Sequence, residues 1–270
     1  MRAVVALVRA PLFSVRKPLT YQAAAAFPLP QPSTLVGALA CSLAVTYGGV
    51  EGVKGDVYVK ECCKLVLREL VRATVKPLTP VARSSLTLSR MRTLELGSDK
   101  VVRRIERGGR IRDAMIREYF YGRLGLLYVF RDGELASKAV KALYLLERLG
   151  DTESCVSVDE VGEGELEPLG EEGVVDTYTP ADWVRTVRGA FSLDSMCPEE
   201  VAAIVIRKRE DIMRRLVKYV LPLREIRENL FAPSPYRVGV REGFSLWSVK
   251  LDDVRINVVL PQGGGVERLQ

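Results

Sequence analysis

The sequence predicts an α+β fold: a ferredoxin-like (RRM-type) βαββαβ domain with an inserted basic β-hairpin arm, followed by a smaller, mostly antiparallel β region. Three observations predict this fold. Patterns typical of strand, helix, strand, strand, helix and strand follow one another over residues 1–161. A basic alternating segment at about 83–112 interrupts that order. Three short alternating segments close the chain, so we expect a second domain over residues 174–270.

The first strand and the first helix are joined by a proline-rich segment. Residues 2–9 form an apolar run suited to a central, buried strand. Alternating prolines hold the chain extended as far as Pro32, so we expect the helix to begin after this residue, with Ser33 as its N-cap. Residues 34–45 are nearly all small or apolar, which predicts a buried helix that ends near Gly48.

Five further segments complete the predicted first domain. Helical spacing of apolar residues indicates a second helix over 55–72, and the extended segment 73–78 follows it. Residues 118–130 are rich in aromatic and aliphatic side chains, which favours a strand. A clear amphipathic pattern predicts a helix over 134–149, and residues 155–158 return as a strand.

The last third of the chain combines acidic, helical and alternating patterns. Residues 151–182 carry eleven acidic and no basic side chains, and we interpret their glycine-rich part, 162–173, as a solvated loop. The alternatives are that this loop docks a basic neighbour or keeps RNA from binding out of register. Residues 198–220 suit a helix, although 201–206 could equally form a strand. The final strands are expected, as an antiparallel meander, at 236–240, 244–251 and 255–260.

Positive charge is concentrated between residues 76 and 123, where twelve Lys and Arg side chains stand against five acidic ones. Arg forms bidentate phosphate contacts and stacks on bases, so this segment suits RNA better than a general solubilising surface would. The alternative is a solvated hairpin held by salt bridges. Strand alternation places at least one ring of the following aromatic run in the core. The candidate RNA contacts here are Arg83, Arg90, Arg92, Arg103, Arg104, Arg107, Arg110, Arg112, Arg117, Tyr119 and Tyr121.

A second candidate anion site lies at the start of the first helix. Residues 1–50 contain no Asp or Glu, so no local carboxylate competes with an anion at the partial positive charge of the helix N-terminus. The candidate phosphate contacts are Arg16, Lys17, Ser33 and Thr34. The alternative interpretation is an ordinary capped core helix.

Composition narrows the classes of function. The chain has no histidine, which removes the usual general acid/base and the commonest metal ligand. Its five cysteines form no C-x-x-C pair and are interpreted as small core residues, so we expect no metal and no cofactor. No apolar run reaches membrane-spanning length, so we expect a cytoplasmic protein with no membrane partner. The scarcity of Asn and Gln suggests a thermophilic source.

Two motifs carry a resemblance to a known family. The first helix opens with Pro-Ser-Thr-Leu-Val-Gly-Ala-Leu-Ala from Pro32, and a Gly-x-x-Glu-Ser segment is formed downstream by Gly150, Glu153 and Ser154. In this order the two motifs resemble family five of the CRISPR-associated proteins, in its archaeal type I-A form. Members of that family are RAMP-superfamily subunits of the Cascade interference complex.

The resemblance implies a non-catalytic RNA-binding subunit. Such a subunit would grip the 5′ handle of a CRISPR RNA, cap the filament of backbone subunits and contact the large subunit that reads target DNA. Residues 150–154 would support the strand edge that faces RNA, with Glu153 orienting its neighbours. One alternative is a metal-independent endoribonuclease, against which the lack of histidine and of clustered carboxylates argues. Another is a purely structural assembly subunit, with the acidic segment as the surface that matches the basic arm.

Overall fold

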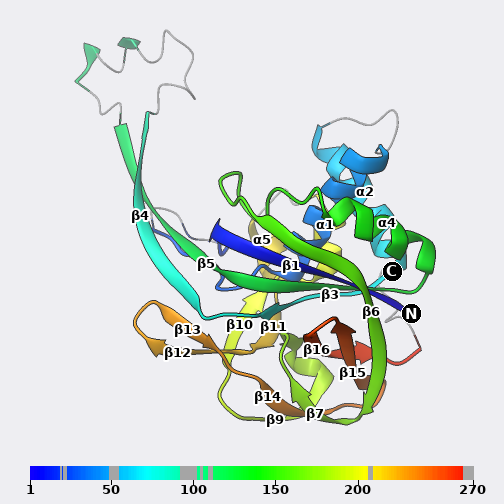
Figure 1. Ribbon diagram of the computed structural model, residues 1–270. Helices are drawn as coiled ribbons and strands as arrows, with labels where there is room; N and C mark the ends of the chain where they lie inside the picture. Colours follow the sequence, from blue (N-terminus) through cyan, green and yellow to red (C-terminus); the bar gives the residue numbers. More distant parts are fainter. Residues whose placement is uncertain are drawn as a thin grey trace.

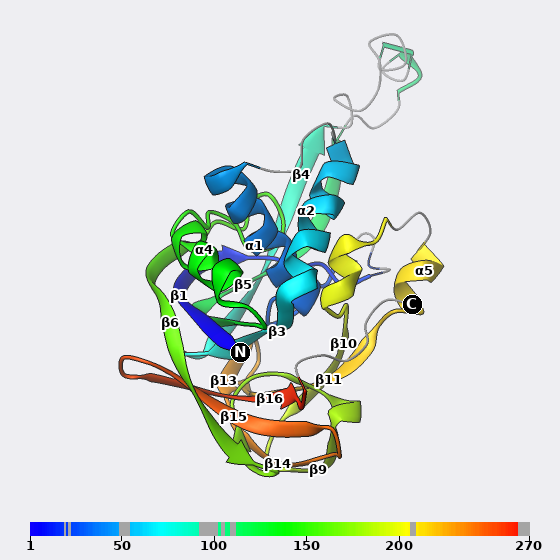
Figure 2. The ribbon, with the colours of Figure 1, turned by 90° about the vertical axis from the view of Figure 1, so that its right-hand side faces the viewer.

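The computed structural model describes residues 1–18, 20, 23–48, 55–91, 102–103, 106–108, 112–205 and 209–263. A large, mainly antiparallel sheet forms its centre, with helices packed on one face and further strands on the other (Figures 1 and 2). The predicted α+β class with antiparallel sheets is therefore confirmed.

Four strands form the centre of this sheet, namely β1 (Arg2–Phe13), β3 (Leu70–Pro77), β5 (Arg112–Phe130) and β6 (Ser157–Gly170). β1 pairs antiparallel with β5 on one side and with β6 on the other, and β3 pairs with the end of β5. The pairing order is therefore β6-β1-β5-β3. The strands predicted at 2–9 and 118–130 are confirmed, because apolar side chains of both strands are buried on both faces of the sheet.

Helix α1 spans Pro32–Tyr47 and begins earlier than the sequence pattern predicted. Its N-cap is Gln31, so the prediction of Ser33 as the N-cap is wrong. Proline lacks an N–H and its fixed φ suits the first helical position, which explains why Pro32 starts the helix instead of preceding it. The helix ends as expected before Gly48, whose φ of 80° is readily adopted by glycine.

Helices α2 (Gly55–Glu69) and α4 (Gly133–Leu143) pack beside α1 (Figure 2), and both are shorter than predicted. Strand β3 begins where α2 ends. The N-cap of α4 is Asp132, whose carboxylate accepts the first helical N–H at 2.6 Å. Beyond α4 the chain turns, yet Leu146 and Leu149 are buried from this turn. The apolar spacing up to residue 149 therefore marks core positions and not helical ones.

The acidic segment forms strands, so the prediction of a loop over 162–173 is wrong. β6 runs through most of it, leaves β1 and pairs next with β15 (Phe244–Leu251), and β7 (Glu172–Val175) follows. Exposed Glu side chains alternate with glycines along β6. These glycines allow the close approach of β15, since a Cβ at Gly162 would lie 2.6 Å from Leu251. The alternation of Glu and Gly along this segment has the two-residue period of a strand, but its acidic and glycine-rich composition is also typical of a loop.

The last three predicted strands are found at the expected positions, but they do not form a meander. β15 and β16 (Val254–Pro261) pair with each other and pack on the sheet face opposite the helices. β14 (Tyr236–Val240) instead pairs with β7 and β9 (Val184–Arg188) in a separate small sheet. The three strands thus belong to two sheets.

The single helix predicted over 198–220 is wrong. This part of the chain forms the 3-10 helix η3 (Glu199–Ala203), the short helix α5 (Arg209–Met213) and β11 (Val217–Leu221). The carboxylate of Glu199 lies in the core, where it contacts the Arg72 guanidinium at 2.9 Å. The remaining elements are β2 (Ala23–Ala24), β4 (Val81–Met91), β8 (Thr179–Pro180), η2 (Ala181–Trp183), β10 (Ser192–Met196), β12 (Leu223–Arg227) and β13 (Leu230–Pro233).

All five cysteines are free. Cys62, Cys63 and Cys197 are buried as predicted, and burial raises the pKa of the Cys63 and Cys197 thiols to about 11. Cys41 and Cys155 are exposed, so their prediction as core residues is wrong. Within the part of the chain that the structure describes, no helix is long and apolar enough to cross a membrane.

Candidate nucleic-acid interface

β4 and the first half of β5 form an arm that extends away from the body of the protein (Figure 1). The two strands pair antiparallel over residues 82–91 and 112–121. Beyond this pairing, Arg103 and Arg107 are exposed, as expected for contacts to a polyanion. Three predicted contacts lie outside the described residues, namely Arg92, Arg104 and Arg110. For two others, Arg90 and Arg112, the structure describes only their place in the strands.

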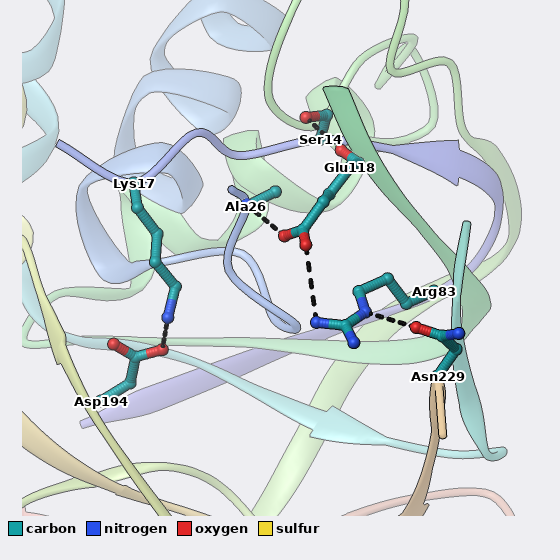
Figure 3. A network of polar contacts seen from close by, with 7 residues as sticks. All are labelled: Ser14, Lys17, Ala26, Arg83, Glu118, Asp194 and Asn229. Atoms are coloured by element: carbon teal, nitrogen blue, oxygen red, sulfur yellow. Dashed lines mark hydrogen bonds and ion pairs between the residues drawn. The ribbon is translucent and has the colours of Figure 1, made fainter. Parts of the chain in front are cut away.

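At the root of the arm, Glu118 on β5 holds three segments together (Figure 3). Its carboxylate accepts the Ala26 N–H at 2.9 Å and pairs with Arg83 of β4 at 3.5 Å. Its backbone carbonyl accepts the Ser14 hydroxyl at 2.8 Å. Arg83 also donates to the side-chain oxygen of Asn229, in the turn between β12 and β13, at 2.8 Å. The predicted RNA contact Arg83 is therefore engaged in fixing the arm.

The Gly-x-x-Glu-Ser motif also joins the body to the root of the arm. Gly150 has a φ of 124°, and a Cβ there would lie 2.6 Å from the backbone oxygen of Ser14 at the end of β1. The buried Ser154 hydroxyl accepts the Ser14 N–H at 2.9 Å. Glu153 contacts the Arg117 guanidinium of β5 at 2.8 Å. Arg117 is only 8% exposed, so its charge is directed to this motif and not to solvent.

The aromatic run on β5 is divided between core and surface. Tyr119 and Phe120 are both 2% exposed, and the Phe120 ring lies 5.9 Å from that of Phe13. Tyr121 is 44% exposed. Of the two tyrosines predicted as stacking faces, only Tyr121 offers its ring to the surface.

A pocket of about 390 Å³ lies between α1, α2 and η3. It brings together the four residues predicted around the helix start, and its polar side is formed by Arg16, Lys17, Gln31, Ser33, Thr34 and Lys60. No lining residue that the structure describes is Asp or Glu. The Lys17 N–H donates to the Ala25 carbonyl at 2.8 Å, next to Ala26 of the arm-root network (Figure 3). The pocket and the root of the arm are therefore neighbours.

The cations of the pocket differ in how far their charge is offset. Lys17 pairs with Asp194 at 2.5 Å, whereas Arg16 is exposed. Lys60 donates to the backbone carbonyl of Ala202 at 2.9 Å, which does not neutralise its charge. Arg16 and Lys60 therefore give the pocket its positive charge. Lys60 was not among the predicted contacts, because the periodicity of α2 does not reveal that η3 packs beside it.

The backbone at the start of α1 is already hydrogen-bonded. The Ser33 N–H donates to the Cys197 carbonyl at 3.3 Å, and the Thr34 N–H donates to the Gln31 carbonyl at 2.9 Å. Pro32 has no N–H to offer. An anion in this pocket would thus be held by side chains, in contrast to the helix N–H site that the sequence suggested.

The fold and the pocket define an α+β protein that carries an extended arm and a basic pocket suited to a polyanion. No family model matches the chain. A CRISPR-associated protein Cas5 of Methanocaldococcus jannaschii is 35% identical over 161 residues, which cover 58% of this chain and 61% of that protein. A CRISPR-associated protein Cas5 of Thermoproteus tenax is 32% identical over 185 residues, which cover 68% of this chain and 75% of that protein.

The chain belongs to the Cas5 family of CRISPR-associated proteins. The crystal structure of a CRISPR protein from Archaeoglobus fulgidus shares its fold, with a TM-score of 0.55 and 16% sequence identity. That likeness covers 95% of this chain and 98% of the other. The matched segment spans about three fifths of the M. jannaschii protein.

Proposed function

We propose that this protein is a non-catalytic, RNA-binding subunit of a type I-A Cascade complex that grips the 5′ handle of a CRISPR RNA. Its partners would be the backbone subunits, whose filament it caps, and the large subunit, through which it meets target DNA indirectly. Membership of the Cas5 family supports this proposal. The pairing order β6-β1-β5-β3 supports a ferredoxin-like core, as expected for a RAMP-superfamily subunit.

The observation that carries the proposal is the convergence of basic and hydroxyl side chains in one pocket beside the arm. Arg16 would bind a phosphate of the handle through its guanidinium, and Lys60 would act as a second point charge. The hydroxyl groups of Ser33 and Thr34 would donate hydrogen bonds to phosphate oxygens. The apolar side of the pocket, which includes Val59, leaves room for a sugar or base.

The arm would close over the same RNA segment. Its root is fixed by Glu118, Arg83 and Arg117, so the arm leaves the body in a defined direction. Arg103 and Arg107 are exposed beyond the paired strands and would contact the phosphate backbone. In this arrangement the arginines at the root orient the arm, and those further out bind RNA.

A gel-shift assay with a CRISPR repeat RNA and a scrambled RNA, over a salt series, tests this proposal. We expect salt-sensitive binding that prefers the repeat sequence, without cleavage of the RNA. Arg16→Gln and Lys60→Gln should each weaken binding and reduce the slope of log affinity against log salt by about 0.7. Lys64→Gln is the matched control, because Lys64 lies one turn from Lys60 on α2 and pairs with Glu61 at 2.6 Å.

The other outcomes identify the competing functions. Specific cleavage without added metal would make the protein a processing endoribonuclease. Absence of binding at low salt would leave a structural assembly subunit. Binding that Lys64→Gln weakens as much as Lys60→Gln would show that general surface charge, and not the pocket, holds the RNA.

A further inference from the structure

The sheet face opposite the helices carries an exposed group of two arginines and one tyrosine near the root of the arm. Arg9 lies on β1, and Tyr121 and Arg123 lie on β5. The side chains of Arg9 and Arg123 are 63% and 52% exposed, and Tyr121 is 44% exposed. Leu7, the preceding residue of β1 on the same face, already belongs to the core beneath β15 and β16. The group, called here the platform, thus begins where this core ends.

Arg9 and Arg123 are direct cross-strand neighbours on the two central strands. Both bind the same carboxylate: Asp159 accepts from Arg9 Nε at 2.7 Å and from an Arg123 terminal nitrogen at 3.1 Å. Like charges directly opposite each other destabilise a sheet, and one carboxylate offsets only one of the two guanidinium groups. A pair of this kind is unfavourable for folding, which points to a ligand that needs both cations.

Tyr121 completes the platform because residues two apart on a strand share a face, about 6.7 Å from each other. The exposed ring of Tyr121 and the exposed side chain of Arg123 therefore lie on the same face of β5. An exposed aromatic ring next to two cations offers a stacking surface for a base and a contact for the neighbouring phosphate. This combination fits an unpaired nucleotide better than it fits a duplex, whose bases are already stacked.

An acidic group borders the platform on one side. Glu160 lies opposite Leu7 of β1, and Asp252 and Asp253 of the β15–β16 turn act on its carboxyl group. Asp252 raises the pKa of Glu160, as expected for carboxyl groups held close together. Three carboxyl groups repel a phosphate backbone, so they limit the platform to the side nearer the arm.

We propose that the platform binds single-stranded nucleic acid, with a base stacked on Tyr121 and a phosphate held by Arg9 and Arg123. Asp159 keeps the two arginines in place in the free protein and lowers their affinity for phosphate. The platform lies on the sheet face away from α1 and α2, and so away from the pocket described above. It is therefore a second contact, independent of handle binding in that pocket.

Fluorescence anisotropy of the full chain with labelled 15-nucleotide oligouridine and oligodeoxythymidine tests this inference. The arginine double variant R9Q/R123Q should weaken binding and lower the salt slope by about 1.4, since two single-strand phosphate contacts are lost. Tyr121→Ala should weaken binding roughly fivefold or more with an unchanged slope, and Tyr121→Phe should bind like the native chain. Arg185→Gln, at an exposed arginine paired with Glu172, is the matched control.

The direction in which Asp159→Asn changes the affinity for the oligonucleotides is the strictest test of the proposal. Removing this carboxylate should tighten binding, because both arginines then face the phosphate without a competing anion. The proposal is overturned if Asp159→Asn weakens binding, or if the arginine double variant behaves like Arg185→Gln. Equal binding of both oligonucleotides would show that the platform recognises the phosphate and base that RNA and DNA share. A preference for oligouridine would identify RNA as the ligand. Binding of neither oligonucleotide at low salt would also overturn the proposal.

The proposals for the pocket and for the platform can be refuted independently of each other. Arg16→Gln should reduce the preference for repeat RNA and leave the effect of Tyr121→Ala on oligouridine intact. If Tyr121→Ala does not change the affinity for oligouridine while repeat RNA still binds, the platform proposal is refuted and the pocket proposal is retained.

Discussion

Replacement of Glu199 by alanine should destabilise the whole protein, because it leaves a buried charge without its main partner. Arg72 on β3 and Glu199 on η3 are each 1% exposed and contact each other at 2.9 Å. The same carboxylate oxygen accepts the Ala73 N–H at 3.2 Å. The Arg72 guanidinium also lies 4.8 Å from the centre of the Trp183 ring. Burial alone would lower the pKa of Arg72, but Glu199 raises it above its usual value, so Arg72 remains charged.

The size of the effect follows from this burial. Removing one partner of a buried ion pair costs about 3–5 kcal/mol. For a chain of this size each 1 kcal/mol lowers the melting temperature by about 2–4 °C, so Glu199→Ala should lower it by roughly 6–20 °C. Circular dichroism melting curves measure the change. Glu172→Ala is the control. Both side chains of its ion pair with Arg185 are more than half exposed, so loss of this pair should lower the free energy of unfolding by less than about 1 kcal/mol.

A second variant separates the charge from the loss of packing. Adding Arg72→Met to Glu199→Ala removes the unpaired cation and should recover part of the lost stability. If Glu199→Ala is no worse than Glu172→Ala, the reasoning from burial is refuted. If the double variant melts lower than the single one, the unpaired charge is not the cause of the loss.

Two further predictions concern the Gly-x-x-Glu-Ser motif and the thiols. Gly150→Ala should destabilise the chain by more than about 1 kcal/mol in urea unfolding, and by more than Gly170→Ala. Gly170 has a φ of 94° but open space around it, so equal losses would show that the contact with Ser14 is unimportant. A thiol reagent at pH 8 should label Cys41 and Cys155 rapidly in the native chain and all five cysteines after denaturation. A third rapidly labelled thiol would contradict the burial of the others.

Strong local patterns in the sequence were sufficient for the centre of the fold. The unbroken apolar run of β1 and the apolar spacing of α1 each predicted the structure that is observed. The basic arm was predicted at about 83–112, and its first strand lies there, but its second paired strand lies at 112–121, at and beyond the end of the predicted range. Prediction was weaker where a residue type has two uses. Pro32 can precede a helix or begin it, and the helix geometry, not the composition, decided between these uses.

Long-range contacts explain the larger errors. The acidic strand β6 looked like a loop because its glycines are explained only by β15, which comes some eighty residues later and packs against them. Glu199 looked like the start of a helix because its partner Arg72 lies 127 residues away. The pocket was half predicted: the residues around α1 were found, but Lys60 enters through the packing of η3, which no local pattern encodes.

The continuity of β5 has a consequence for how the reach of the arm can change. Its residues 122–130 are paired with β1 inside the core, and residues 112–121 are paired with β4 in the arm. A matched insertion of two residues in each arm strand would lengthen the arm by about 6.7 Å and keep every side chain on its original face. An insertion of one residue would reverse the faces of everything beyond it. Relatives of this protein can therefore span different distances with the same core, provided that their arms differ in steps of two residues per strand.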